Sequence, residues 1–112
     1  MKFYHFSPVQ GLKELKPNQP ADSDLAGVYL CLNLEDSWYW LSRMLNEGYN
    51  FADVCLYEVH LDPSDVLHPR YERDKVIWLS WNGAIIIETD SNGFNNYQQF
   101  VVPHKVECRQ IL

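Results

Sequence analysis

The sequence predicts a single α+β domain over residues 1–112, with a core made mainly of strands and with one main helix. Two patterns indicate this class. Apolar or alternating segments of strand length recur between clusters of turn-forming residues. Only residues 34–47 carry apolar side chains at helical spacing. A chain of 112 residues, of which 46% are hydrophobic, has room for one modest core.

The N-terminal part alternates strands with polar connections. Residues 2–5 predict a short aromatic strand that a serine–proline pair ends, and residues 9–15 are expected to form a single helical turn. The proline-rich, polar residues 16–24 are typical of a long loop. The continuous apolar run at 27–33 predicts a buried strand.

Residues 34–47 predict the one long helix. Asn33 is a suitable N-cap, and Gly48 suits the position just after a helix, where a left-handed backbone is common. Trp38 and Leu41 share one face with Leu45, so the helix is expected to be amphipathic.

The remainder of the chain predicts further strands and turns. Residues 62–65 and 90–93 have the composition of turns. Residues 71–81 carry both strand and loop signals. Their two tryptophans are expected either to line a groove or to pack in the core. Residues 83–89 are expected to form a buried strand. The other strands are expected at 54–61, at 66–68 (ended by Pro69), at 97–102 and at 106–112.

Composition and charge argue against several classes of function. A net charge of −6 argues against a nucleic-acid or anionic-membrane partner. Cys31, Cys55 and Cys108 form no Cys-x-x-Cys pair and are expected to be reduced thiols. With no signal peptide and no long apolar run, the chain is expected to be cytoplasmic. Neither a metal site nor a glycine-rich phosphate loop is expected, because the histidine and glycine spacings fit neither.

Four segments together resemble a known family. They are FYHFSP at 3–8, GVYLCLNLEDSWYWLSRM at 27–44, CLYEVHLDPSDVL at 55–67 and NYQQFVVPHKVECRQIL at 96–112. In this order they resemble the diphtheria-toxin-like ADP-ribosyltransferase superfamily, whose small phage anti-CRISPR members also begin with an aromatic–His–x–Ser–Pro segment. The resemblance covers nearly the whole chain. It implies two small, mostly antiparallel sheets that hold NAD in a cleft between them.

The resemblance implies roles for three residues of the N-terminal part. His5 would hydrogen-bond a ribose hydroxyl of NAD, and the backbone of His5 and Phe6 would bind the nicotinamide amide. Tyr29 would stack on the nicotinamide ring. The residues alone also allow purely structural roles. His5 would then be a histidine at a strand end whose hydrogen bonds are made within the protein, and Tyr29 would be an aromatic residue of the core.

Gln99 stands where the family has its catalytic glutamate. A glutamine can position the ribose hydroxyl through its amide oxygen, but it brings no negative charge to the oxocarbenium ion and cannot act as a base. Loss of one such electrostatic partner commonly costs ~100- to 1,000-fold in rate. Asp90 is the best remaining candidate for a base. Gln99 also fits a structural role as a polar residue of an edge strand, and Asp90 also fits a role as a solvated turn residue.

The resemblance therefore implies an NAD-dependent mono-ADP-ribosyltransferase that modifies a macromolecule, expected to be a protein. Such a chain would serve as a toxin-like, anti-defence effector of a phage or mobile element, with NAD as substrate and no metal. Gln99 leaves open a weak or inactive nucleotide-binding or protein-docking module of the same fold. A structural protein with no ligand site is a third possibility. Under the first function, alanine at His5 or Tyr29 should abolish nucleotide binding and leave thermal stability nearly unchanged.

Overall fold

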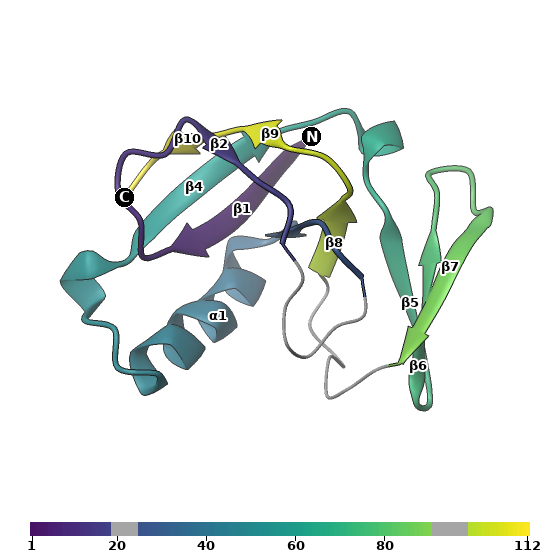
Figure 1. Ribbon diagram of the computed structural model, residues 1–112, viewed down its shortest axis with the longest axis horizontal. Coiled ribbons are helices and arrows are strands. Elements are labelled where there is room, and N and C mark those ends of the chain that lie inside the picture. Colours follow the sequence, from purple (N-terminus) through teal and green to yellow (C-terminus); the bar gives the residue numbers. More distant parts are fainter. Residues whose placement is uncertain (19–24, 91–98) are drawn as a thin grey trace.

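The computed structural model describes residues 1–18, 25–90 and 99–112. This part of the chain is an α+β domain with a single α-helix and three small antiparallel sheets (Figure 1). The sheets have the strand orders β10-β4-β1-β3-β8, β2-β9 and β5-β6-β7. The elements are β1 (Lys2–Ser7), β2 (Glu14–Leu15), β3 (Val28–Cys31), α1 (Leu34–Asn46), β4 (Cys55–His60), β5 (His68–Glu72), β6 (Lys75–Leu79), β7 (Ile85–Asp90), β8 (Gln99–Val102), β9 (Val106–Glu107) and β10 (Arg109–Gln110), with 3₁₀ turns at Phe51–Asp53 and Pro63–Asp65.

The five-stranded sheet has two different faces, because side chains alternate along each strand. One face carries Phe3 and Leu30, which pack against Leu15 of β2, and is called the β2 face below. The opposite face carries Phe6, whose ring centroid lies 6.5 Å from that of Trp38 on α1, and is called the α1 face. Figure 1 shows α1 running along one side of this sheet, with β5, β6 and β7 at the far end of the molecule.

The predicted helix is confirmed, and α1 ends one residue before the expected position. Gly48 follows it with φ of +102°, the left-handed conformation that glycine adopts without strain. Asn33 occupies the N-cap position, but its side chain makes no capping hydrogen bond. In the described residues, no helix is both long and apolar enough to cross a membrane.

The helical turn predicted at 9–15 is wrong. Gly11 has φ of +76°, which interrupts a right-handed helix, and β2 follows it. The Tyr57 hydroxyl ties this segment to β4, because it donates to the Val9 carbonyl at 2.5 Å and accepts from the Leu12 amide at 3.1 Å. Residues 9–15 therefore cross the β2 face as irregular chain and a short strand.

The expectation that Pro69 ends a strand is wrong, because Pro69 lies within β5 of the β5-β6-β7 sheet. Residues 71–81 belong mainly to a hairpin in which β5 pairs with β6, and Pro69 lies within β5 opposite Trp78. The sheet tolerates this proline because β5 is an edge strand of it. Trp78 is fully buried and its Nε1 donates to Thr89 Oγ1 at 3.0 Å, so this tryptophan belongs to the core.

The strand predicted at 83–89 exists as β7, but the expectation that it is buried is wrong. Ile85 and Ile86 expose 57% and 56% of their surface, and Ile87 exposes 40%. A continuous apolar run indicates burial only when the sheet is covered at that position. In the described residues β7 is an edge strand, paired with β6 alone.

The other predicted strands have mixed outcomes. Those at 2–5, 27–33 and 54–61 are confirmed as β1, β3 and β4 with slightly different ends, and that at 106–112 divides into β9 and β10. The loop at 16–24 and the turn at 90–93 lie largely outside the described residues. Of the strand at 97–102, the structure describes the part from position 99 onward.

Candidate functional site

Strands β1 and β3 separate at the position of His5. β1 pairs with β4 along all 6 of its residues. It pairs with β3 only where Tyr4 lies opposite Cys31. Beyond that point the carbonyl of Tyr29 accepts a hydrogen bond from His5 Nδ1 at 2.8 Å. The imidazole therefore bridges the two strands just where their backbone pairing stops.

A cavity of about 500 Å³ lies at this separation. Its walls include His5 and Ser7 of β1, Val28 of β3, and residues of the segment 11–18 that crosses the β2 face. The volume lies within the range of pockets that bind small molecules and cofactors. The separation of the two strands thus opens into a space large enough for part of a nucleotide.

The hydrogen bond to Tyr29 fixes the tautomer of His5. A carbonyl oxygen can only accept, so Nδ1 carries the proton and Nε2 keeps a lone pair. Burial lowers the pKa of His5 below its usual value of 6.5, and the bond to the Tyr29 carbonyl opposes this effect only in part. His5 is therefore neutral at pH 7. Its Nε2, which makes no hydrogen bond within the described residues, is ready to accept one from a hydroxyl group.

Tyr29 lies on the other face of the same sheet. The register of β1 and β3 places the side chains of Tyr4, Phe6 and Tyr29 on the α1 face, and that of His5 on the β2 face. Only 8% of Tyr29 is exposed. Its hydroxyl donates to the Leu25 carbonyl, and its ring lies edge-on to Trp78 with 6.5 Å between centroids. Tyr29 thus packs in the core, and its ring does not line the cavity beside His5.

Gln99 and Asp90 are placed by their backbones alone, because their side chains lie outside what the structure describes. Gln99 begins β8 opposite Cys31 of β3, so the strands of the three predicted residues, β1, β3 and β8, are adjacent. Asp90 ends β7 opposite Lys75, in a different sheet. Phe6 is backbone-paired with β4, and its ring faces α1.

Cys31, which lies beside the backbone of Gln99, does not supply a nucleophile. Burial raises its pKa to about 12, the charge of Asp36 adds to this rise, and a hydrogen bond with Trp40 opposes it. A thiol with such a pKa stays protonated at neutral pH, and only a thiolate attacks effectively. Among the described residues no group of three His, Cys, Asp or Glu side chains could hold a metal ion.

The cavity wall formed by the segment 11–18, including Lys13 and Lys16, is not predicted by the sequence. The glycine at position 11 is a usable signal for a break in the helix, but no local pattern shows which face of the sheet this segment crosses. Comparison of the chain with protein-family models, with curated proteins and with solved structures gives no match in any of the three.

Proposed function

We propose that the cavity between β1 and β3 binds NAD or a closely related nucleotide, with His5 Nε2 accepting a hydrogen bond from a ribose hydroxyl. The observation that carries this proposal is the fixed, neutral tautomer of His5 in the cavity wall. A pre-oriented acceptor costs little entropy when a hydroxyl binds to it. This role is also the one that the resemblance to the ADP-ribosyltransferases implies for His5.

The strand order supports the finer fold assignment, an ADP-ribosyltransferase-like arrangement of two small sheets. The three positions taken from the resemblance, His5, Tyr29 and Gln99, are far apart in the sequence. Their strands β1, β3 and β8 are nevertheless neighbours in one sheet. The short β2-β9 sheet covers the β2 face of that sheet and contributes to the cavity wall.

Two lysines give the cavity a chemistry that suits a dinucleotide. The chain has a net charge of −6, yet Lys13 and Lys16 both belong to the cavity wall. Glu14, between them, lies 3.6 Å from Lys105 and is partly neutralised by it. Ammonium groups pair with phosphate oxygens as point charges, so these lysines would attract the pyrophosphate of NAD.

The reaction that follows from this binding mode is transfer of ADP-ribose to a protein, with nicotinamide leaving. Gln99 would make this transfer slow, because an amide supplies no negative charge to the oxocarbenium ion. A second candidate, a nucleotide-binding module without turnover, is favoured by Tyr29. Its ring is already packed against Trp78 and is not open for stacking on nicotinamide.

Two substitutions at His5 test the binding proposal. In His5→Asn, the amide nitrogen replaces Nδ1 as donor to the Tyr29 carbonyl, and the acceptor at Nε2 is lost. In His5→Gln, the longer amide reaches the Nε2 position instead. We expect NAD affinity, measured by calorimetry, to fall about 3- to 10-fold in His5→Asn, which is the effect of losing one hydrogen bond.

The matched control is His104→Asn, since this exposed histidine hydrogen-bonds only the neighbouring Lys105 carbonyl among the described residues. The control should bind NAD like the wild type. Equal NAD affinity in the wild type and in His5→Asn, at unchanged melting temperature, contradicts the placement of NAD beside His5. Absence of NAD binding to the wild type contradicts the proposed function as a whole.

A separate assay addresses transfer. Incubation of the protein with labelled NAD and a cell lysate should label at least one acceptor protein slowly. Gln99→Glu should raise NAD hydrolysis about 100-fold, because it restores the carboxylate, and Gln99→Ala is the control without charge. Binding of NAD without any gain in Gln99→Glu would contradict the placement of Gln99 beside the ribose and would favour the binding module.

A further inference from the structure

A row of three side chains crosses the β2 face of the five-stranded sheet. Tyr57 of β4 lies opposite His5 of β1 and also opposite Gln110 of β10. Residues that face each other in paired strands project to the same side of a sheet, so Tyr57 and Gln110 share the β2 face with His5. Figure 1 shows the chain between β1 and β2 at this end of the molecule, opposite to the end that holds β5, β6 and β7.

The hydroxyl of Tyr57 joins the two ends of a bend that crosses this face. The bend runs from Val9 to Leu12, and in the described part of the chain no backbone hydrogen bond connects these two residues. Instead, the hydroxyl donates to the Val9 carbonyl at 2.5 Å and accepts from the Leu12 amide at 3.1 Å. Because Tyr57 is fully buried, the core holds the group that fixes the bend.

Gln110 fixes the same bend from the neighbouring strand. Its amide oxygen accepts a hydrogen bond from the Gly11 amide at 2.8 Å. Its amide nitrogen donates to the Leu112 carbonyl at 3.3 Å, which determines the orientation of the amide group. Two side chains, from β4 and β10, therefore hold the start of the segment 11–18. We call this pair of residues the Tyr57–Gln110 clamp.

The segment 11–18 depends on such anchors, because little of it is regular strand. Of these eight described residues, only Glu14 and Leu15 form a strand, β2. At the far end of the segment, the backbone of Asn18 exchanges two hydrogen bonds with that of Gly27. The clamp holds the near end. A change in the clamp should therefore shift the part of the cavity wall that follows it.

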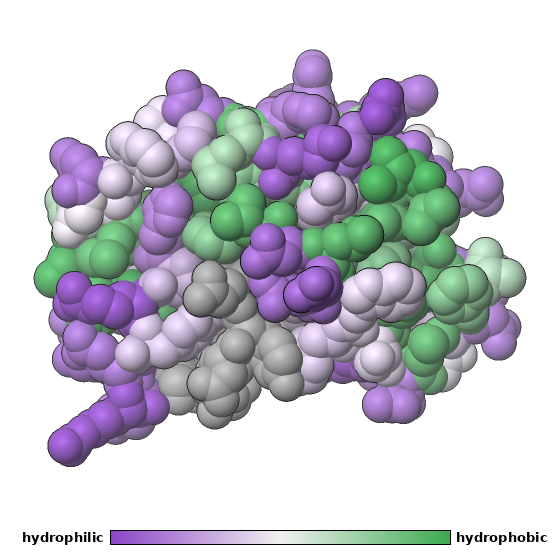
Figure 2. Space-filling model, turned by 180° about the vertical axis from the view of Figure 1, so that it is seen from behind, coloured by the Kyte–Doolittle hydropathy of each residue, from purple (hydrophilic) through white to green (hydrophobic). Residues whose placement is uncertain are grey.

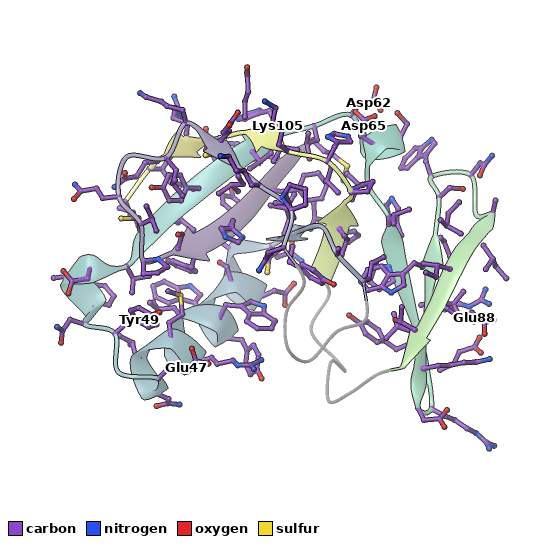
Figure 3. The ribbon with its side chains drawn as sticks, viewed as in Figure 1. Glu47, Tyr49, Asp62, Asp65, Glu88 and Lys105 are labelled. Atoms are coloured by element: carbon purple, nitrogen blue, oxygen red, sulfur yellow. The ribbon has the colours of Figure 1, made fainter. Side chains whose placement is uncertain are left out.

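This part of the wall carries cationic groups. Lys13 and Lys16 are exposed and belong to the cavity wall. Lys105 lies 3.6 Å from Glu14, and Figure 3 shows Lys105 at the edge where β2 and β9 lie side by side. Because Lys105 partly neutralises Glu14, the two wall lysines remain available to an anionic group in the cavity.

We propose that Tyr57 is a positioning residue for the pyrophosphate of NAD, and that the clamp holds Lys13 and Lys16 where they can pair with phosphate oxygens. This inference rests on the proposed function. Cations that are held in place before the ligand arrives bind it more tightly, because less conformational entropy is lost on binding. A phenylalanine ring would fill the same space in the core, so the hydroxyl is the part of Tyr57 that acts on the wall.

A double-mutant cycle tests whether Tyr57 acts through the lysines. Calorimetry gives the NAD affinity of the wild type, of Tyr57→Phe, of the pair Lys13→Gln and Lys16→Gln, and of all three changes together. We expect Tyr57→Phe to weaken NAD binding about 3- to 10-fold. Once both lysines are replaced, it should have no further effect. The NAD affinity of Tyr57→Phe should also fall less steeply with added salt, because fewer ion pairs form.

Equal NAD affinity in the wild type and in Tyr57→Phe overturns this inference and leaves the proposed function standing. So does an undiminished effect of Tyr57→Phe after both lysines are replaced, since a purely structural role of the hydroxyl gives additive losses. A wild type that binds no NAD overturns the inference and the proposed function together.

Gln110→Ala tests the clamp without a change to the buried ring. Gln110 belongs to β10, an edge strand of its sheet, so this substitution leaves the core intact. It removes the acceptor of the Gly11 amide, and NAD affinity should fall about 3-fold while the two lysines are present. Wild-type NAD affinity in Gln110→Ala would overturn the role of the clamp.

Two variants serve as controls for these affinities. Tyr4→Phe removes a hydroxyl from the α1 face of β1, opposite to the face of His5. Ile86→Thr alters the far end of the molecule, where Ile86 is 56% exposed and Figure 2 shows hydrophobic surface on the left. Both variants should bind NAD like the wild type. Weaker binding in either, at unchanged melting temperature, would place the NAD contacts outside this wall and overturn the inference.

Hydrogen exchange of backbone amides, followed by NMR, tests the clamp without NAD. The Leu12 amide donates to the Tyr57 hydroxyl, so its exchange should become about 10-fold faster in Tyr57→Phe. The Val101 amide, which donates to the Leu67 carbonyl, is the reference and should keep its rate. Equal exchange of the Leu12 amide in both proteins would show that the hydroxyl does not hold the bend, and would overturn the inference.

Discussion

The position of Tyr29 in the core gives a prediction that separates packing from ligand binding. Tyr29 is 8% exposed, contacts Trp78 edge-on and donates a hydrogen bond to the Leu25 carbonyl. Truncation of a buried aromatic ring to alanine costs about 3–5 kcal/mol in free energy of unfolding. For a domain of this size, that cost corresponds to a fall in melting temperature of roughly 12–20 °C. Tyr29→Phe removes only the hydroxyl and should cost about 1 kcal/mol.

Both values can be measured by urea denaturation and thermal melting of the two variants beside the wild type. Tyr29→Phe should in addition retain NAD affinity, since the ring does not line the cavity that holds His5. A Tyr29→Ala protein that melts within a few degrees of the wild type would refute the packing argument. Such a result would support the expectation from the sequence, in which Tyr29 contacts the ligand and can be replaced by alanine with little change in thermal stability.

Two further predictions concern stability. Gly27→Ala should cost about 1–3 kcal/mol in urea denaturation, because a Cβ at Gly27 would lie 2.3 Å from a methyl group of Val101 on β8; an unchanged urea midpoint would contradict this close approach. Stability should also fall on acidification. Burial lowers the pKa of His5, so unfolding takes up a proton as the pH drops below 6.5. A hydrogen bond from His60, aided by Arg109, lowers the pKa of Glu58, so a second loss follows below about 4.5. In His5→Asn, the urea midpoint should no longer fall as the pH drops below 6.5, because the titrating imidazole is gone. It should still fall below about pH 4.5, where Glu58 becomes protonated.

Local patterns in the sequence are sufficient for the helix and for several strands. Gly48 and the apolar spacing within residues 34–47 locate α1 almost to the residue, because caps and helical periodicity act within a few residues. Of the apolar face expected from that spacing only Leu41 is buried, while Trp38 and Leu45 are 52% and 38% exposed. The same reasoning fails at Ile85 and Ile86. An apolar run has the same composition in a covered strand and at an open edge, and only the sheet order distinguishes the two.

The candidate site could be predicted only in part, for a similar reason. Alternation along a strand shows that neighbouring side chains lie on opposite faces, but it does not relate the faces of two strands that are far apart in sequence. The pairing of Tyr4 with Cys31 determines which side chains of β1 and β3 share a face. It places His5 and Tyr29 on opposite faces of the sheet. The strands of the predicted residues are adjacent, while the cavity depends on how the segment 11–18 crosses the sheet.

The most direct test of the account is the protonation of His5 during an NAD titration, followed by long-range proton–nitrogen NMR of the imidazole. Near pH 7 we predict a neutral ring with its proton on Nδ1 before NAD is added, since that atom donates to the Tyr29 carbonyl. Addition of NAD should then shift the Nε2 resonance while the tautomer stays the same. A ring protonated on Nε2, or resonances that NAD leaves unchanged at saturation, would contradict the central claim.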